Sequence, residues 1–311
     1  MSTREAAARA PLDVDTLVWR SLLFVPASNQ RFVDKAHTRG ADGIILDLED
    51  SVPREERPAA RARLAASAES VARSGADVLV RINAEPEECA LDLEAAVIPG
   101  VHALMVPKVE SAAGLRAVSA RVESLERARG LAVGGIRFML LIESAAALLQ
   151  AEEIARADGR SIALDLGAED FATTAGMVPE PDTLAVPKQL ALLAARAAGL
   201  VPIGIMGTVA EYRDVDAYAE LARRSRRFGF EGATCIHPGV VPALNAAFTP
   251  SPEQVDHARR VVDAYEQAQA RGEGAINVDG KMVDVPVADR ARRLLARHAI
   301  IEARAARGSG A

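Results

Sequence analysis

Eight short apolar segments, spread between residues 20 and 238, constrain the fold of this chain more than any other feature of the sequence. Each segment is rich in Ile, Leu or Val, and none alternates strictly between apolar and polar residues. Unbroken apolar runs of this kind are typical of parallel strands that are covered on both faces. The segments are RSLLFVP (20–26), GIILDLE (43–49), DVLVRIN (77–83), HALMVPK (102–108), RFMLLIE (137–143), SIALDLG (161–167), VPIGIM (201–206) and ATCIHP (233–238).

Amphipathic stretches separate these segments, among them RFVDKAHTRG, SAAALLQAEEIARA and KQLALLAARAAGL. Eight alternations of strand and helix predict an α/β fold, a (β/α)8 TIM barrel, over residues 18–250. An open doubly wound sheet would alternate in the same way. Such a sheet usually carries a glycine-rich phosphate loop after its first strand, and FVPASNQ is not one.

The segments on either side of the barrel have different patterns. Residues 1–17 are predicted to form a flexible N-terminal tail. Beyond the barrel, Ser251, Pro252 and Gln254 predict a helix start with a capping box, and Asp279-Gly280 predicts a hairpin turn. With a last helix expected near 286–305, residues 251–311 form a predicted C-terminal extension of helices and a hairpin. We expect this extension to cover the barrel or a neighbouring subunit.

Composition and charge exclude several classes of function. The formal net charge of −6 leaves no electrostatic footprint for nucleic acid. No apolar run is long enough to span a membrane, and the N-terminus lacks the apolar core of a signal peptide. The two cysteines, Cys89 and Cys235, have no CxxC spacing, which argues against a disulfide framework and against a zinc site. We therefore expect a cytoplasmic protein.

Polar residues follow most of the predicted strands at the point where each strand ends. In a parallel barrel the carboxyl ends of all strands open at one face, so these side chains are expected to meet there. They are Asp47, Glu49, Arg81, Asn83, Lys108, Glu143, Glu169, Asp170 and His237. The sequence therefore predicts a shared acidic pocket that contains one arginine.

Glu143 and Asp170 are the best candidates for metal ligands in this pocket. Carboxylates that are held close together in a dry site raise each other's pKa unless a cation lies between them. Two carboxylates, completed by water and substrate oxygens, are a usual site for Mg2+, and the oxygen-only set favours Mg2+ or Mn2+ over zinc. In the alternative interpretation, Asp170 or Ser144 caps the helix after its strand and Glu143 is only an acid at a helix start.

The other strand-end residues admit two interpretations each. Asp47 and Glu49 either orient the metal site or are solvated acids at a strand end. Arg81 ends an apolar strand, so its planar guanidinium is either buried or points into the pocket, and we favour the second, in which it clamps a carboxylate. His237 is either a histidine with satisfied hydrogen bonds or an acid–base group, and Cys235 is expected in the core.

The chain resembles the HpcH/HpaI aldolase and citrate lyase β-subunit family. The resemblance spans residues 20 to about 295 and rests on the joint occurrence of many motifs. These are RSLLFVPASNQRFVDKA, GADGIILDLEDSVP, LVRINA, MVPKVESAAGL, LLIESAAALLQAEEIA, LGAEDFA, GFEGATCIHP, LNAAFTPSPEQVDHAR and DGKMVDVP.

The resemblance implies a (β/α)8 barrel that uses Mg2+ to cleave a C–C bond reversibly in a hydroxyacyl thioester, commonly a CoA ester. Substrates of the malyl-, citramalyl- or citryl-CoA type would give acetyl-CoA, or a related acyl-CoA, and an oxo acid. The resemblance also implies that Glu143 and Asp170 are the metal ligands and that Arg81 contacts the substrate. Residues Gly167, Ala168 and Glu169 are expected to line the substrate site.

Two further assignments come from the resemblance. Arg31 and Lys35 match a segment that lies near CoA, and Asp284 matches an acid–base residue that an adjacent subunit supplies. The C-terminal extension would then be a lid in a homotrimer or hexamer. With the chemistry carried by a metal ion, Lys108 is expected to act electrostatically or structurally rather than to form a Schiff base.

Several functions within the family stay open. The chain departs from the usual motifs at Lys188, where many members carry Arg before Ser-Gln, and also in IHPGVVPALN and GIMGTVAEYRD. These departures bear on the identity of the thioester. A malyl-CoA-type thioesterase with the same site is one alternative. Others are a citrate lyase β subunit that works only with an acyl carrier protein and a catalytically silent barrel.

Overall fold

The computed structural model describes residues 11–308 and divides into two compact units. The first unit extends to Phe248, and the second begins at Thr249. Each is described by itself below.

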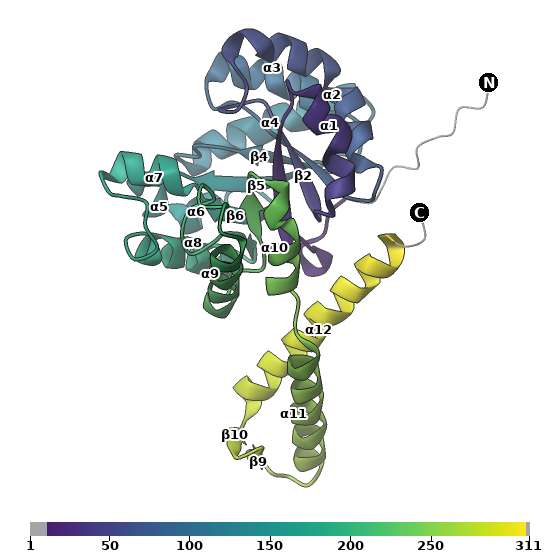
Figure 1. Cartoon of the computed structure of the whole chain (residues 1–311), viewed down its shortest axis with the longest axis vertical. Coiled ribbons are helices and arrows are strands. Elements are labelled where there is room, and N and C mark those ends of the chain that lie inside the picture. Colours follow the sequence, from purple (N-terminus) through teal and green to yellow (C-terminus); the bar gives the residue numbers. More distant parts are fainter. Residues whose placement is uncertain (1–10, 309–311) are drawn as a thin grey trace, which may run out of the picture. The chain divides into compact units, whose positions relative to one another are not determined.

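The first unit is built on an eight-stranded parallel sheet in the order β7-β6-β5-β4-β3-β2-β1-β8 (Figure 1). Each of the eight apolar segments contains one strand, as predicted. The strands are β1 (Ser21–Pro26), β2 (Gly43–Asp47), β3 (Asp77–Arg81), β4 (Ala103–Val106), β5 (Arg137–Ile142), β6 (Ser161–Leu166), β7 (Val201–Pro202) and β8 (Ala233–Cys235).

The sheet closes into a barrel through a short junction between β7 and β8. An isolated parallel bridge joins Ile203 to Gly232, and the N–H of Gly204 donates to the carbonyl of Gly232 at 2.8 Å. On the other side of this bridge, the N–H of Glu231 donates to the carbonyl of Pro202 at 3.0 Å. The sheet edges are thereby paired, and the predicted TIM-barrel fold is confirmed.

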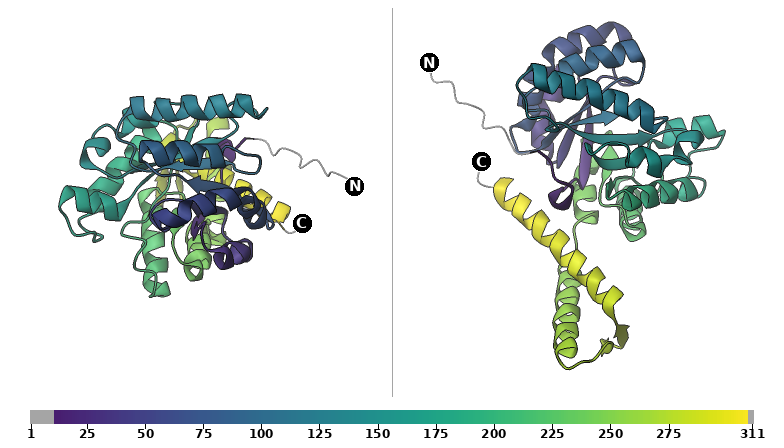
Figure 2. Two further views of the ribbon diagram at one scale, coloured as in Figure 1. Left: turned by 90° about the horizontal axis from the view of Figure 1, so that it is seen from above. Right: turned by 180° about the vertical axis from the view of Figure 1, so that it is seen from behind.

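Helices surround the strands of this unit, as the views in Figure 2 show. The α-helices are α1 (Gln30–Ala36), α2 (Arg57–Ala72), α3 (Pro86–Ala96), α4 (Ala112–Ala128), α5 (Ala145–Leu148), α6 (Ala151–Ala155), α7 (Ala168–Ala175), α8 (Ala185–Ala197), α9 (Val215–Phe228) and α10 (Val241–Ala247). Short 3-10 turns lie at Val14–Thr16, His37–Arg39, Arg54–Glu56 and Pro238–Val240.

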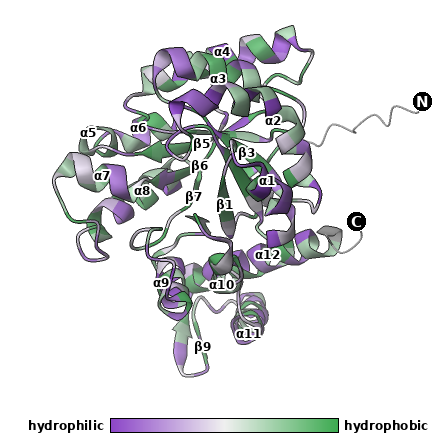
Figure 3. Cartoon of the chain, turned by 45° about the horizontal axis from the view of Figure 1, so that its top comes forward, coloured by the Kyte–Doolittle hydropathy of each residue, from purple (hydrophilic) through white to green (hydrophobic). Residues whose placement is uncertain are grey.

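Both faces of the sheet are buried, which explains why the strand segments do not alternate between apolar and polar residues. Leu22, Ile45 and Leu79 belong to a core inside the barrel, whereas Leu23 and Ile44 belong to a core between strands and helices. Successive side chains of a strand point to opposite faces, so each face must be apolar here. Figure 3 shows the strands as mainly hydrophobic and the outer helices as mixed.

Residues 11–17 pack against the barrel, although the sequence suggested that they belong to a flexible tail. Leu12 and Leu17 are buried in the inner core, and the Leu12 carbonyl accepts a hydrogen bond of 2.9 Å from Arg137 Nε. Trp19 is buried beside them and donates to Asp77 at 2.9 Å. Two isolated leucines give no periodic signal in the sequence, so only the folded barrel provides their partner surface. Residues 1–10 of the predicted tail lie outside the described residues.

The second unit contains α11 (Pro252–Ala270), a hairpin of β9 (Ile276–Val278) and β10 (Lys281–Val283), and α12 (Val285–Gly308). The capping box of Ser251 and Gln254 forms as predicted. So does the hairpin turn, in which Asp279 and Gly280 take left-handed φ values of 51° and 78°. Within the described part of the chain, no helix is both long and apolar enough to cross a membrane. The role of this unit as a lid stays a prediction.

We predict that Gly232→Ala strongly destabilises the protein, because a Cβ at this position would lie 1.6 Å from the carbonyl oxygen of Trp19. The clashing atom belongs to the backbone where the barrel closes, so rotation of a side chain cannot relieve the clash. Thermal unfolding should show a loss of at least about 6 °C in Tm. Gly159→Ala is the matched control, because nothing lies within 4 Å of its added Cβ, and a Tm loss as large in this control would contradict the explanation.

Candidate active site

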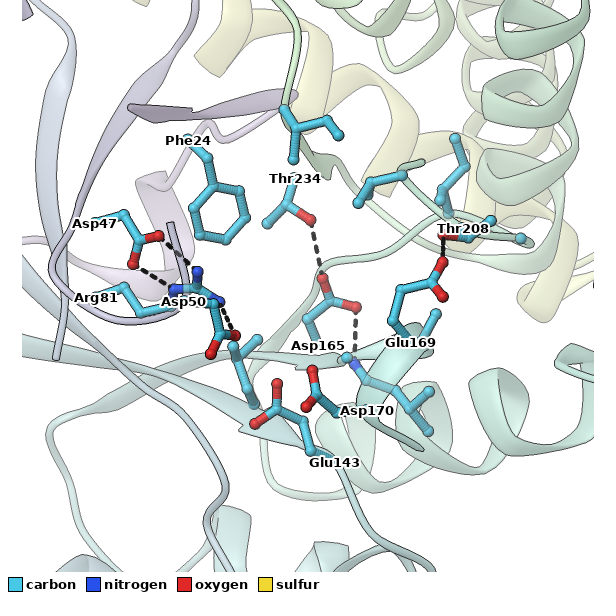
Figure 4. A pocket seen from close by; sticks show the side chains of 18 of the residues that line it. Phe24, Asp47, Asp50, Arg81, Glu143, Asp165, Glu169, Asp170, Thr208 and Thr234 are labelled. Carbon is cyan, nitrogen blue, oxygen red and sulfur yellow. Dashed lines mark hydrogen bonds and ion pairs between the residues drawn. The ribbon is translucent and has the colours of Figure 1, made fainter. Parts of the chain in front are cut away.

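A cavity of about 260 Å3 lies at the carboxyl ends of the strands, and Figure 4 shows the side chains that line it. Residues from β1, β2, β3, β5, β6 and β8 contribute, together with the segment after β7. The charged members are Asp47, Asp50, Arg81, Glu143, Asp165, Glu169, Asp170 and Lys188. Predicted pocket residues from four different strand ends therefore share one cavity.

Arg81 is fixed by a two-pronged ion pair with Asp47. Its Nε and Nη2 atoms each lie 2.6 Å from an oxygen of Asp47, and its Nη1 lies 3.1 Å from Glu49 Oε2. The guanidinium also stacks on Phe24, 4.8 Å from the ring centre. Burial alone would raise the pKa of Asp47, but hydrogen bonds and charge from Arg81 outweigh it and lower that pKa. Asp47 thus stays ionised and holds the arginine at the cavity wall.

Asp47 also shapes the loop that carries the other acids after β2. Its two oxygens accept the backbone N–H groups of Glu49 at 3.0 Å and of Ser51 at 3.2 Å. Breaking a buried pair of this kind by removing one partner costs about 3–5 kcal/mol, since the other charge is left uncompensated. Asp47 and Glu49 are both buried and ion-paired, so they are not solvated strand-end acids.

Lys108 links the acids of β2 to the end of β5. Its Nζ lies 2.7 Å from Glu49 Oε1, and its backbone N–H donates to Glu143 Oε2 at 2.6 Å. Lys108 adopts a left-handed φ of 49°, which is uncommon for a residue with a side chain. Burial raises the pKa of Glu49 even though Arg81 and Lys108 oppose the rise.

The carboxylates of Glu143 and Asp170 lie next to each other in Figure 4. The pKa of Glu143 rises to about 7, chiefly because the group is buried. The Lys108 N–H opposes this rise, and the negative charges of Glu49 and Asp170 add to it. Asp170 does not cap its helix: it lies in the first turn of α7, where Gly167 holds the N-cap position. Ser144, in contrast, does cap α5, because its hydroxyl accepts the N–H of Ala147 at 3.1 Å.

Gly167 is packed directly against the carboxylate of Glu143. A Cβ at position 167 would lie 2.5 Å from Glu143 Oε1, so no larger residue fits unless Glu143 moves. The backbone is fixed here too, because the Gly167 N–H donates to the Ile142 carbonyl at 3.0 Å and Thr174 Oγ1 to the Glu143 carbonyl at 3.0 Å. Glu143 is therefore held in one place from both sides.

The donor set of Glu143 and Asp170 fits a hard divalent cation. The pair supplies carboxylate oxygens only, and its mutual repulsion would be relieved by a positive ion. Within residues 11–308, no group of three or more His, Cys, Asp or Glu side chains is arranged to hold a metal. Two protein ligands leave most of a six-coordinate shell to water and substrate, as Mg2+ prefers and zinc does not.

Asp165, Thr208 and Thr234 line the cavity but were not predicted as site residues, and Lys188 had been noted only as a departure from the family motifs. Glu169 accepts a hydrogen bond from the Thr208 hydroxyl, which comes from the segment after β7. Asp165, on β6, pairs with Lys188 at 3.3 Å and accepts from Thr234 at 3.4 Å. An acid inside the apolar segment SIALDLG was a signal for Asp165. The threonines gave no signal, because nothing local distinguishes them from surface threonines.

The remaining predicted residues lie elsewhere. Lys35 lines a second cavity of about 320 Å3 together with Phe32, Arg39 and His237, whereas Arg31 is exposed on α1. The His237 Nδ1 accepts the N–H of Gly239 at 3.1 Å, and its ring stacks on Tyr212 with centroids 4.9 Å apart.

These contacts favour the interpretation of His237 as a histidine with satisfied hydrogen bonds. Cys235 is buried in the core as expected. Lys108 and Asn83 line a third cavity, of about 210 Å3. Asp284 belongs to the second unit, where its side chain accepts the N–H of Val287 at 3.3 Å at the start of α12.

The protein is an α/β barrel whose strand ends form an acidic site. This site contains two adjacent carboxylates that suit a divalent cation and an arginine held by an ion pair. Residues 20–238 match the family model of HpcH/HpaI aldolase/citrate lyase, and the chain belongs to that family. The family resemblance stated from the sequence is therefore confirmed.

Three relatives illustrate the range of the family. The chain is 36% identical over 288 residues to the (3S)-malyl-CoA thioesterase of Cereibacter sphaeroides, covering 92% of this chain and 96% of the relative. It is 35% identical over 284 residues to the citrate lyase subunit beta of Escherichia coli, covering 89% and 92%. The crystal structure of the protein CitE from Mycobacterium tuberculosis, in complex with magnesium, acetoacetate and coenzyme A, superposes with a TM-score of 0.72 at 31% identity, covering 91% and 99%.

We predict that the metal-free protein loses stability relative to its Glu143→Gln variant as the pH rises from about 4.5 to about 7. In that window the folded state keeps a proton on Glu143 that the unfolded state releases, because the folded pKa is raised from 4.5 to about 7. The difference should be on the order of 3 kcal/mol across the window and constant above it. Denaturant unfolding at several pH values without divalent cations measures it, and parallel pH profiles of the two proteins would refute it.

Proposed function

We propose that this protein is a Mg2+-dependent carbon–carbon lyase that cleaves a hydroxyacyl-CoA thioester into acetyl-CoA, or a related acyl-CoA, and an oxo acid. The observation that carries the proposal is the adjacent pair of Glu143 and Asp170, which shares one cavity with the ion-paired Arg81. Malyl-, citramalyl- and citryl-CoA are the candidate substrates.

The ligands in the related CitE complex support this chemistry. That protein binds magnesium, acetoacetate and coenzyme A together, which are the types of molecule that an acyl-CoA lyase handles. The two curated relatives act on, or belong to enzymes that act on, hydroxy acids or their thioesters, as their names state. The residues of this chain suit the same ligands, because hard carboxylate oxygens bind Mg2+ and an arginine fork binds a carboxylate.

The roles of the residues follow from their positions. Glu143 and Asp170 would hold Mg2+, which when bound supplies a Lewis acid and a template for the oxygens of the acid fragment. Arg81 uses one N–H of Nη2 for Asp47, and within residues 11–308 the second N–H has no hydrogen-bond partner. This second N–H would meet the charge on that fragment. Asp47 and Glu49 keep the guanidinium aimed at the cavity. Gly167, Ala168 and Glu169 form the wall beside the metal pair.

Cleavage breaks the bond between the hydroxyl-bearing carbon and the α-carbon of the thioester. The hydroxyl loses its proton and becomes the oxo group of the acid, and the electron pair of the broken bond moves into a thioester enolate. A proton donor must then convert this enolate into the acyl-CoA product. We assign that role to Asp284 of an adjacent subunit, which in the reverse direction would take a proton from the acetyl methyl group.

The second cavity is the proposed site of the CoA moiety. Lys35 and Arg39 offer positive charge, and Phe32 offers an exposed aromatic face, 51% accessible. Cations and an aromatic surface suit the phosphates and the adenine of CoA. Arg31 on the same helix would add a further charge at its rim.

Two other functions are favoured by specific relatives. The 36% identity to a (3S)-malyl-CoA thioesterase supports hydrolysis of the same class of ester at the same site. The 35% identity to a citrate lyase subunit beta supports a subunit that acts on an acyl-carrier-protein ester. The thioesterase differs from the lyase in its products, and the citrate lyase subunit differs from it in the carrier of the acyl group.

We predict that incubation with a panel of hydroxyacyl-CoA esters and Mg2+ yields an oxo acid and an acyl-CoA in equal amounts. Excess EDTA should abolish the reaction and added Mg2+ should restore it, and Glu143→Gln and Asp170→Asn should each lower kcat by about a thousandfold or more. Chromatography of both products measures the outcome. Free CoA without acyl-CoA would identify the thioesterase, and turnover only of carrier-protein esters would identify the citrate lyase subunit.

We predict that two inactive variants, Asp284→Asn and Glu143→Gln, complement each other when they are mixed and reassembled. A site with intact Glu143 in one subunit would receive intact Asp284 from the other. In a random mixture of a cyclic oligomer, about a quarter of the wild-type activity should return. Each variant alone is the control. If the mixture stays as inactive as each variant alone, Asp284 does not serve a neighbour's site. A monomeric mass by light scattering would also contradict the proposed trimer or hexamer.

A further inference from the structure

Lys188 is a buried residue in the wall of the cavity that holds Glu143 and Asp170. It belongs to α8 and is only 3% exposed. Its Nζ donates to the carbonyl of Leu166 at 2.6 Å and lies 3.3 Å from Asp165 Oδ1. Lysine is almost never fully buried unless it is paired, and the loss of water is compensated here by these two oxygens.

Both partners of Lys188 lie at the carboxyl end of β6. Asp165 and Leu166 are the last residues of this strand, and Asp165 Oδ1 also accepts the Leu166 N–H at 2.7 Å. The other oxygen of Asp165 accepts from Thr234 of β8 at 3.4 Å. The ammonium therefore ties the end of β6 to α8 and, through Asp165, to β8, which lies on the other side of β7.

The chain that follows this anchor carries the proposed metal site. Gly167 comes directly after Leu166 and is packed against Glu143, where even a Cβ would not fit. Helix α7 begins at Ala168 and presents Asp170 in its first turn. Because so few residues separate Leu166 from Asp170, a shift of the strand end would move Asp170 and release the contact of Gly167 with Glu143 together.

We propose that Lys188 is a positioning residue whose buried ammonium fixes the turn between β6 and α7 and thereby sets the separation of Asp170 from Glu143. The inference rests on the proposed function, in which this pair holds a divalent cation. Lys188 acts through Leu166 and Asp165 and does not itself bind the metal.

A purely electrostatic role makes the opposite prediction. If Lys188 served only to neutralise Asp165, its removal would leave the cavity more negative, and a cation would bind as tightly as before or more tightly. If it positions the turn, its removal weakens cation binding in spite of the added negative charge. The sign of the change in affinity separates the two roles.

The experiment titrates Mn2+ into the full-length protein without substrate and follows free Mn2+ by electron paramagnetic resonance. Lys188→Met keeps most of the side-chain length and removes the ammonium, and we expect the Kd for Mn2+ to rise about tenfold or more. An unchanged or lower Kd would overturn the inference. If the wild-type protein itself binds no Mn2+, the proposed function fails first, and this result is distinct from a failure of Lys188→Met alone.

The double variant Asp165→Asn/Lys188→Met removes both charges, so the formal charge of the cavity equals that of the wild type. It also avoids an unpaired buried carboxylate, which guards against misfolding of the single variant. The Leu166 carbonyl still loses its donor, and we expect the Kd for Mn2+ to stay about tenfold above the wild-type value. A wild-type Kd in this double variant would show that geometry is unaffected and would overturn the inference.

Arg160→Met is the matched control for a lost buried ion pair. Arg160 lies directly before β6, at the opposite end of the same strand, and pairs with Glu126 at 2.9 and 2.7 Å. It is 5% exposed, so its loss should also lower Tm, yet the Kd for Mn2+ should stay within about twofold of the wild-type value. An equal weakening by Arg160→Met would assign the effect of Lys188 to general destabilisation.

Discussion

Closure of the parallel sheet is the constraint on which the site depends. The bridge between Ile203 and Gly232 joins β7 to β8, so that all eight strands deliver their carboxyl ends to one mouth. Residues far apart in sequence, such as Asp47 and Asp170, thereby come to line one cavity. Gly232 permits this closure because the Trp19 carbonyl occupies the space of a side chain. The chemistry at the mouth is therefore a consequence of how the sheet closes.

The acids at this mouth differ in whether they have a cationic partner within the protein. Asp47 has Arg81, Glu49 has Lys108 and Asp165 has Lys188 as a cationic partner. Among residues 11–308, neither Glu143 nor Asp170 forms such an ion pair, and the pKa of Glu143 rises to about 7. Glu143 is buried and Asp170 is half-buried, and the negative charge of Asp170 adds to the rise in the pKa of Glu143. A bound metal ion would relieve this repulsion. This imbalance is the physical basis for the proposed Mg2+ site.

The arginine and the lysines at the mouth have different tasks. Arg81 is locked in a planar, two-pronged pair with Asp47 at the cavity wall, and its guanidinium suits recognition of a further carboxylate there. Lys108 connects neighbouring loops, with its ammonium on Glu49 and its backbone on Glu143. Lys188 lines the cavity and holds a strand end. The positive charges of Arg81, Lys108 and Lys188 are therefore all engaged by protein groups, and a substrate would bind to side chains that are already fixed in position.

The sequence by itself determined the barrel, the family, and the acids and the arginine at the strand ends. The apolar segments, their spacing and the residues that follow them can all be read along the chain without knowledge of its contacts. It also determined the capping box and the hairpin of the second unit, which need only neighbouring residues. Tertiary structure alone decided that Asp47 clamps Arg81, that Gly167 presses on Glu143, and that Asp165, Lys188, Thr208 and Thr234 join the cavity. It likewise decided that Leu12 and Leu17 are buried. These facts depend on contacts between strands and helices that are distant in sequence, and no local pattern encodes which partner a side chain will meet once the barrel has closed.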